Sequence, residues 1–132
     1  MMELKVKATD QNLQAVNDFV HSILPSECSE MVLNQIDLAV EEIFVNIAHY
    51  AYDGAEGDAV INSSYDDGVF KISFSDSGKK FNPLERDDPD ITLSAEERSI
   101  GGLGIFLTKK FMDSVEYEYQ DGKNILKISK KI

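Results

Sequence analysis

Glu42 and Asn46 are the first residues in the chain whose types and spacing could support chemistry. They stand one helical turn apart in the run EIFVN (42–46), so a carboxylate and an amide can reach the same small ligand. An amide oxygen is a hard donor that Mg²⁺ accepts beside phosphate oxygens and water, and a carboxylate can polarise an attacking hydroxyl. The pair therefore predicts a metal ligand and a general base, with a solvated helix face as the alternative.

His49 lies one turn beyond Asn46 on the same polar line, which also includes Gln35 and Asp53. This line is about 130° away from the apolar stripe that must face the sheet. His49 could line the same pocket, and an ordinary histidine on the helix surface is the alternative.

Asp76 follows a strand pattern in residues 69–75 and continues the face that carries Phe70, Ile72 and Phe74. A carboxylate aimed at the interior is unfavourable unless a donor meets it, and the exocyclic amine of adenine would suit. Gly78 would then let the backbone approach a flat ring. A loop anchor at the end of the strand is the alternative.

A glycine-rich run, Gly101-Gly102-Leu103-Gly104, precedes an amphipathic helical pattern. Glycines at the start of a helix bring bare amides and a favourable field close to an anion such as phosphate. Neither GxxxxGK[ST] nor GxGxxG in a βαβ unit occurs, which excludes a P-loop enzyme and a dinucleotide-binding domain. A flexible hinge into a helix is the alternative.

The remaining pattern predicts the elements that must position these residues. Strands are expected at 3–8 (at a sheet edge), 58–65, 69–75, 114–119 and 123–130, and helices at 10–24 (with Asp10 as the cap), 27–52 and 102–112. Asp67-Gly68 and Asp121-Gly122 are typical hairpin turns, whereas residues 76–100 are irregular. This order predicts one α+β domain over residues 1–132, a two-layer α/β sandwich with helices on one face of a mixed, mostly antiparallel sheet.

Composition limits the partners and the location. The net charge of −11 disfavours direct binding of nucleic acid and could attract a basic protein surface, although acidity could also serve only solubility. Cys28 is the single cysteine, so an internal disulfide is excluded. We find neither a secretory signal nor an apolar run long enough to span a membrane, and therefore expect a cytoplasmic protein.

Taken together, the three motifs resemble those of the GHKL (Bergerat-fold) ATPases in their order and spacing. The run EIFVN resembles the N-box, DSGKKF (76–81) the first glycine box and GGLG (101–104) the second, with residues 82–100 in the place of the ATP lid. Within that superfamily, residues 101–116 look most like the bacterial anti-sigma-factor serine kinases.

The resemblance implies a role for each matching residue. Asn46 would hold Mg²⁺, Glu42 would be the general base, Asp76 would receive the adenine amine, and Gly102 and Gly104 would cradle phosphates. The remaining ATP-binding residues predicted from the motifs are Gly78, Phe81, Gly101 and Leu103, and His49 and Arg98 are added from outside the motifs. Either Arg86 or Arg98, both in the lid region, could reach the γ-phosphate, and solvated loop arginines are the alternative.

Family members bind a sigma factor and phosphorylate an anti-anti-sigma (STAS-domain) protein on serine, usually as homodimers. The resemblance therefore predicts a serine protein kinase that uses ATP and Mg²⁺ and sequesters a sigma factor. A nucleotide-binding switch without kinase activity is the alternative, and the presence of Glu42 disfavours it because a pure binder needs no base.

Overall fold

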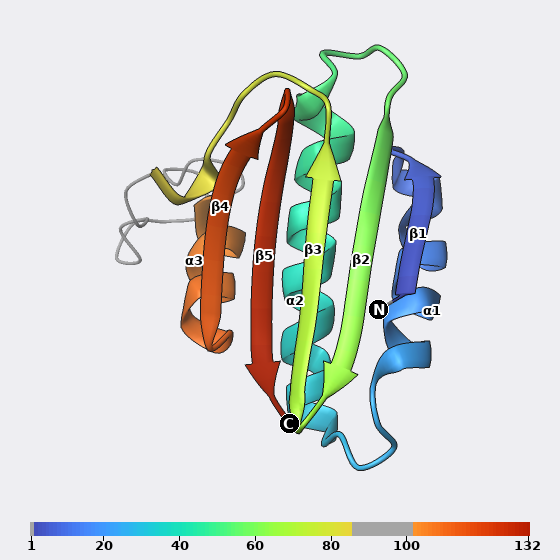
Figure 1. Cartoon of the computed structure of the whole chain (residues 1–132), viewed down its shortest axis with the longest axis vertical. Helices are drawn as coiled ribbons and strands as arrows, with labels where there is room; N and C mark the ends of the chain where they lie inside the picture. The colour runs from blue at the N-terminus through green and yellow to red at the C-terminus, as the bar shows by residue number, and fades with distance from the viewer. Residues whose placement is uncertain (1, 86–101) are drawn as a thin grey trace.

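The computed structural model describes residues 2–85 and 102–132 as two layers, with three α-helices on one face of a five-stranded sheet (Figure 1). The strands are β1 (Met2–Lys7), β2 (Asp58–Asp66), β3 (Val69–Asp76), β4 (Ser114–Gln120) and β5 (Lys123–Lys131). The helices are α1 (Leu13–Ile23), α2 (Glu30–Asn46) and α3 (Gly102–Phe111). Short 3-10 turns lie at Asp10–Asn12 and Pro83–Glu85, and a π-helical turn lies at Ile47–Ala51. The predicted two-layer α+β sandwich is confirmed.

The sheet has the strand order β1-β2-β3-β5-β4, so β1 forms an edge as predicted. All four pairings between the described strands are antiparallel. The sequence predicts a mixed, mostly antiparallel sheet, so its antiparallel character is confirmed, and none of these pairings is parallel. The central strands β3 and β5 pair so that Asp76 stands directly opposite Asn124. This register brings together two polar residues that lie 48 positions apart in the chain.

The two predicted hairpin turns are present and have the expected backbone conformation. Asp67 and Gly68 have φ values of 50° and 77°, and Asp121 and Gly122 have 55° and 77°. Two successive residues with positive φ fit a type I′ turn, whose twist matches that of the flanking strands. The turns therefore set the β2–β3 and β4–β5 registers locally.

Helix α2 packs its apolar side onto the centre of the sheet, and its buried residues include Ile36, Val40, Ile43 and Phe44. This is the side that the helical periodicity predicts. The helix begins at Glu30 rather than at 27, because the Ser29 hydroxyl accepts a hydrogen bond from the Val32 amide (3.2 Å) and caps it. None of the helices in the described part of the chain is long and apolar enough to cross a membrane.

The region around Asp10 differs from the prediction. Asp10 begins a 3-10 turn, and α1 starts only at Leu13, so Asp10 does not cap this helix. Its carboxylate instead lies 2.8 Å from His49 Nε2, beyond the end of α2. The Asp10 side chain, predicted to cap the helix, thus pairs with His49, which is distant in the sequence.

We expect Ser29→Ala to lower the free energy of unfolding by about 1 kcal/mol, because the Val32 amide loses the side-chain acceptor that caps the start of α2. Urea denaturation followed by circular dichroism measures the change. Ser26→Ala, an exposed serine in the same connection, is the matched control and should leave the midpoint unchanged. Equal midpoints for both variants would show that the cap contributes nothing.

Candidate functional site

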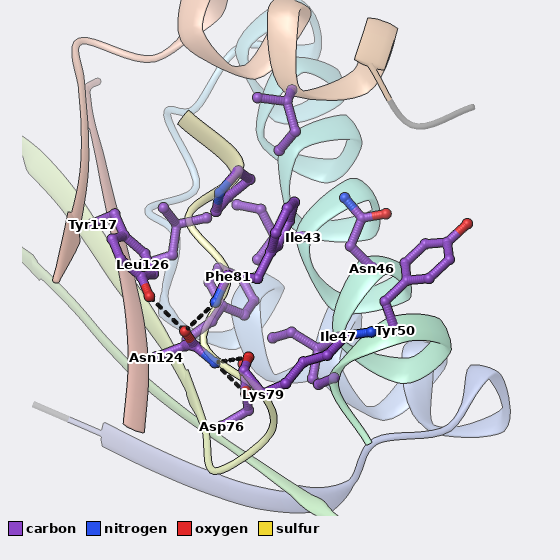
Figure 2. A pocket seen from close by; sticks show the side chains of 14 residues that line it. Ile43, Asn46, Ile47, Tyr50, Asp76, Lys79, Phe81, Tyr117, Asn124 and Leu126 are labelled. Carbon is purple, nitrogen blue, oxygen red and sulfur yellow. Dashed lines mark hydrogen bonds between the residues drawn. The ribbon is translucent and has the colours of Figure 1, made fainter. Parts of the chain in front are cut away.

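A cavity of about 220 Å³ lies between the C-terminal half of α2 and the sheet (Figure 2). Its walls come from α2 and the π-helical turn, from the ends of β3, β4 and β5, from the segment after β3, and from α3. The lining residues are Ile43, Asn46, Ile47, Tyr50, Ala51, Phe74, Asp76, Lys79, Phe81, Pro83, Ile105, Tyr117, Asn124 and Leu126. Most of this lining is apolar, so the few polar side chains must set the orientation of any ligand.

Asp76 reaches this cavity from the end of β3 and is 7% exposed. Its Oδ1 accepts hydrogen bonds from the Gly78 amide (2.9 Å) and from Asn124 Nδ2 (3.0 Å). Among the described residues, both hydrogen bonds to the carboxylate go to this one oxygen. Oδ2 is therefore the atom that can accept a hydrogen bond from a ligand.

Asn124 holds the segment after β3 in place through all four of its hydrogen-bonding positions. Its Nδ2 donates to Asp76 Oδ1 and to the Lys79 carbonyl (2.9 Å), and its Oδ1 accepts from the Phe81 amide (3.0 Å) and the Tyr117 hydroxyl (2.5 Å) (Figure 2). Burial, helped by the Asp76 carboxylate, raises the pKa of Tyr117, so this hydroxyl keeps its proton and can donate.

Gly78 lets the segment after β3 pack against the end of the π-helical turn, a contact that the sequence does not reveal. A Cβ atom at this position would overlap the backbone of Ala51 at the end of the π-helical turn. The next amide, Lys79 N, donates to the Ala51 carbonyl (3.0 Å), and Lys79 Nζ lies 2.9 Å from Asp53 Oδ1. These contacts join the segment after β3 to the end of the helix layer. The structure therefore gives Gly78 a packing role rather than a position among the residues that line the cavity.

Asn46 lines the cavity from the last turn of α2, and its Nδ2 donates to Glu42 Oε1 (3.1 Å). This bond leaves the amide oxygen of Asn46 as the atom that can bind a cation. Glu42 is partly buried and is not among the described residues that line the cavity, but it lies one hydrogen bond away from it. The predicted pairing of the two side chains is present in the structure.

Gly104 faces this pair from the first turns of α3. A Cβ atom added to Gly104 would overlap the end of the Glu42 side chain. Thr108, which is 1% exposed, donates from its hydroxyl to the Gly104 carbonyl (2.8 Å) and holds this part of the backbone. The N-box and the second glycine box are thus in contact, as their common assignment to one site requires.

His49 is not brought to the cavity. Its Nε2 lies 2.8 Å from the Asp10 carboxylate, its ring is exposed, and it is not among the described residues that line the cavity. The prediction that His49 binds ATP is therefore not supported by its position. The helix turns from α to π geometry after Asn46, so the spacing of an ideal α-helix no longer applies there.

Phe81 lines the cavity and is 42% exposed, as expected for a residue at its mouth. Leu103 and Gly102 belong to the first turn of α3, which starts where the glycine run predicts a helix. Three other predicted residues, Arg86, Arg98 and Gly101, lie outside the described residues.

Sequence reasoning missed Asn124, Tyr117 and Tyr50. Asn124 continues the apolar face of β5 that carries Leu126 and Ile128, so the test that found Asp76 could also have found it. Tyr50 follows the predicted polar line by one residue, and only the π-helical turn brings it to the cavity.

The sequence matches known proteins over most of its length. A family profile described as "Histidine kinase-like ATPase domain" matches residues 6–130. The serine-protein kinase RsbW of Listeria monocytogenes is 28% identical over 99 residues, which cover 71% of this chain and 63% of that protein. The anti-sigma F factor of Clostridium acetobutylicum is 27% identical over 135 residues, which cover 98% of this chain and 92% of that protein.

Solved structures of low sequence identity share the fold. The RsbU and RsbW domains from Mycobacterium tuberculosis align with a TM-score of 0.65 at 15% identity, over 99% of this chain and 32% of that chain. A blue-light activated histidine kinase domain from Erythrobacter litoralis aligns with a TM-score of 0.63 at 15% identity, over 96% of this chain and 64% of that chain. The two-layer fold and the family match over residues 6–130 are both consistent with the three motifs. The chain belongs to the histidine kinase-like ATPase domain family, the GHKL group.

Proposed function

We propose that the chain is an ATP-dependent serine protein kinase and anti-sigma factor. In this proposal it binds a sigma factor and transfers the γ-phosphate of ATP to a serine of an anti-anti-sigma (STAS-domain) protein. Membership of an ATPase domain family implies ATP binding, and the names of the relatives support the kinase and anti-sigma roles. The observation that carries the proposal is that Asp76 and Asn46 line one cavity from opposite layers.

The adenine ring would occupy the apolar part of this cavity. Asp76 Oδ2 is an acceptor for the exocyclic amine, while Ile43, Ile47 and Phe74 offer apolar surface to the ring. A carboxylate acceptor held rigidly by Gly78 and Asn124 favours adenine over guanine, because guanine presents a carbonyl at the equivalent position. The site would therefore select ATP by one hydrogen bond made in an apolar surrounding.

Mg²⁺ would bind at Asn46. No group of three or more His, Cys, Asp or Glu side chains in residues 2–85 and 102–132 is arranged to hold a metal ion. One amide oxygen fits a shared site, in which phosphate oxygens and water complete the octahedral coordination of Mg²⁺. When bound, the ion would neutralise charge on the phosphates. Glu42 would keep the Asn46 amide oriented through the bond to Nδ2.

Glu42 would act as the general base. The partner serine would give its hydroxyl proton to the Glu42 carboxylate while its oxygen bonds to the γ-phosphorus of ATP. The bond from that phosphorus to the β–γ bridging oxygen breaks, and ADP leaves with the electron pair. Glu42 lies one hydrogen bond from Asn46, which lines the cavity, and this proximity supports a role for its carboxylate beside the phosphates.

The charge distribution supports a basic protein partner. No lysine or arginine occurs between Lys7 and Lys71, a stretch that includes α1 and α2. Helices α1 and α2 are therefore acidic, whereas α3 carries Lys109 and Lys110. The acidic pair of helices could attract the basic surface with which a sigma factor contacts DNA. We propose a homodimer in the cytoplasm, where a sigma factor and its regulators would meet.

We expect Asp76→Asn to weaken ATP binding by at least about tenfold, because the amide keeps an acceptor for Asn124 and Gly78 but turns a donor toward the adenine amine. Isothermal titration calorimetry with Mg-ATP measures the change. Asp66→Asn, at the exposed far end of β2, is the control with the same charge change. An unaltered ATP affinity in Asp76→Asn would remove the adenine contact from the proposal.

We expect Asn124→Asp to lower the free energy of unfolding by about 1–3 kcal/mol at neutral pH, because the Lys79 carbonyl loses its donor and a second carboxylate faces Asp76. In the folded variant the two carboxylates share a proton, so the pKa of one of them is higher than in the unfolded chain. The folded state then binds more protons, so the loss should shrink as the pH falls toward about 5. Denaturation at several pH values tests this, with the exposed Asn34→Asp as control. A loss that does not depend on pH would contradict it.

We expect Glu42→Gln to reduce the rate of phosphate transfer to the partner serine by about 10²–10⁴-fold while ATP binding is retained, because glutamine cannot accept the proton. Transfer of labelled phosphate and calorimetry measure the two properties. Glu41→Gln, the exposed neighbour, should transfer at the wild-type rate. Undiminished transfer in Glu42→Gln would exclude it as the base, and tight binding without transfer in the wild type would favour the switch function.

A further inference from the structure

We propose that Gly104 is a positioning residue for Glu42: it lacks a side chain because the Glu42 carboxylate fills the space that a side chain would take. This assigns to Gly104 a role other than the cradling of phosphate that the motif predicts. The packing rests on the structure alone, and only its consequence for catalysis rests on the proposed function.

The conformation of Gly104 does not itself require glycine. Gly54, Gly68 and Gly122 have positive φ values, in the range that favours glycine, and nothing lies within 4 Å of a Cβ atom built on them. Gly104 instead lies inside α3 without a positive φ, and glycine is one of the least favourable residues in such a place. Backbone conformation therefore does not explain the glycine, and the space that Glu42 takes does.

Glu42 is what occupies that space. A Cβ atom on Gly104 would overlap three atoms of Glu42, namely Cγ, Cδ and Oε2. The end of the Glu42 side chain thus lies against the backbone of α3. The other carboxylate oxygen, Oε1, accepts from Asn46 Nδ2 at 3.1 Å. Glu42 is therefore held between its own helix and the facing one.

Neither side of this contact is free to move away without consequence. The Gly104 carbonyl accepts from the Thr108 hydroxyl at 2.8 Å within α3, and Thr108 is itself buried, so this turn of the helix is internally braced. A side chain at position 104 would have to push Glu42 aside, and the Asn46 amide that donates to Glu42 would lose its orientation. Because Asn46 lines the cavity, a substitution in α3 would disturb the end of the site where the metal is expected.

A double-mutant cycle of Gly104→Ala and Glu42→Ala tests the proposal. Mg-ATP affinity by calorimetry and the thermal midpoint without nucleotide are measured for the wild type, both single variants and the double variant. We expect Gly104→Ala in the wild-type background to lower the midpoint by several degrees and to weaken ATP binding about tenfold or more. In the Glu42→Ala background the same substitution should leave ATP affinity unchanged and keep or raise the midpoint, since only the higher helix propensity of alanine remains.

Gly68→Ala is the control, because it adds the same methyl group where a φ of 77° requires glycine, in the β2–β3 turn. It should lower the midpoint equally in both backgrounds. If Gly104→Ala weakens ATP binding or lowers the midpoint equally with and without Glu42, the proposal is overturned, and Gly104 serves the phosphates or the helix directly. Neither readout involves phosphate transfer, so the cycle can succeed in a protein that proves not to be a kinase.

Discussion

The hydrogen bond between Asn124 and Asp76, across the central strands β3 and β5, is the interaction on which the site depends most. An ionised carboxylate in an apolar cavity is unfavourable unless donors meet it, and Asn124 supplies one of the two donors that do. The same amide fixes the Lys79 carbonyl and the Phe81 amide. One buried side chain thus sets both the orientation of the acid and the path of the segment that covers it.

Two close contacts lie beside the cavity, and a glycine makes each of them possible. At one end, the absence of a side chain at Gly78 lets this segment meet the Ala51 backbone, and the Lys79 amide bonds to it. At the other end, Gly104 admits the Glu42 side chain between α2 and α3. Each glycine therefore allows a close contact: Gly78 lets the segment after β3 approach the end of the helix layer, and Gly104 lets α3 approach α2 within that layer. Apolar packing alone would tend to close such a space.

Between these two contacts the polar groups are few and specifically placed. Asp76 presents an acceptor from the sheet, and Asn46 presents an amide from the helix, with mainly apolar side chains between them. Few polar groups on a rigid frame suit a ligand that has a flat aromatic part and a charged part.

The sequence alone determined the element order, the two type I′ turns, the buried side of α2 and the inward direction of Asp76, since each follows from local periodicity or turn chemistry. It also placed Glu42 and Asn46 one turn apart. Only the tertiary structure decided that Asn124 would face Asp76, that His49 would pair with Asp10, and that Gly104 would accommodate Glu42. These three outcomes depend on strand register and on the packing of elements distant in the chain, which no local pattern encodes.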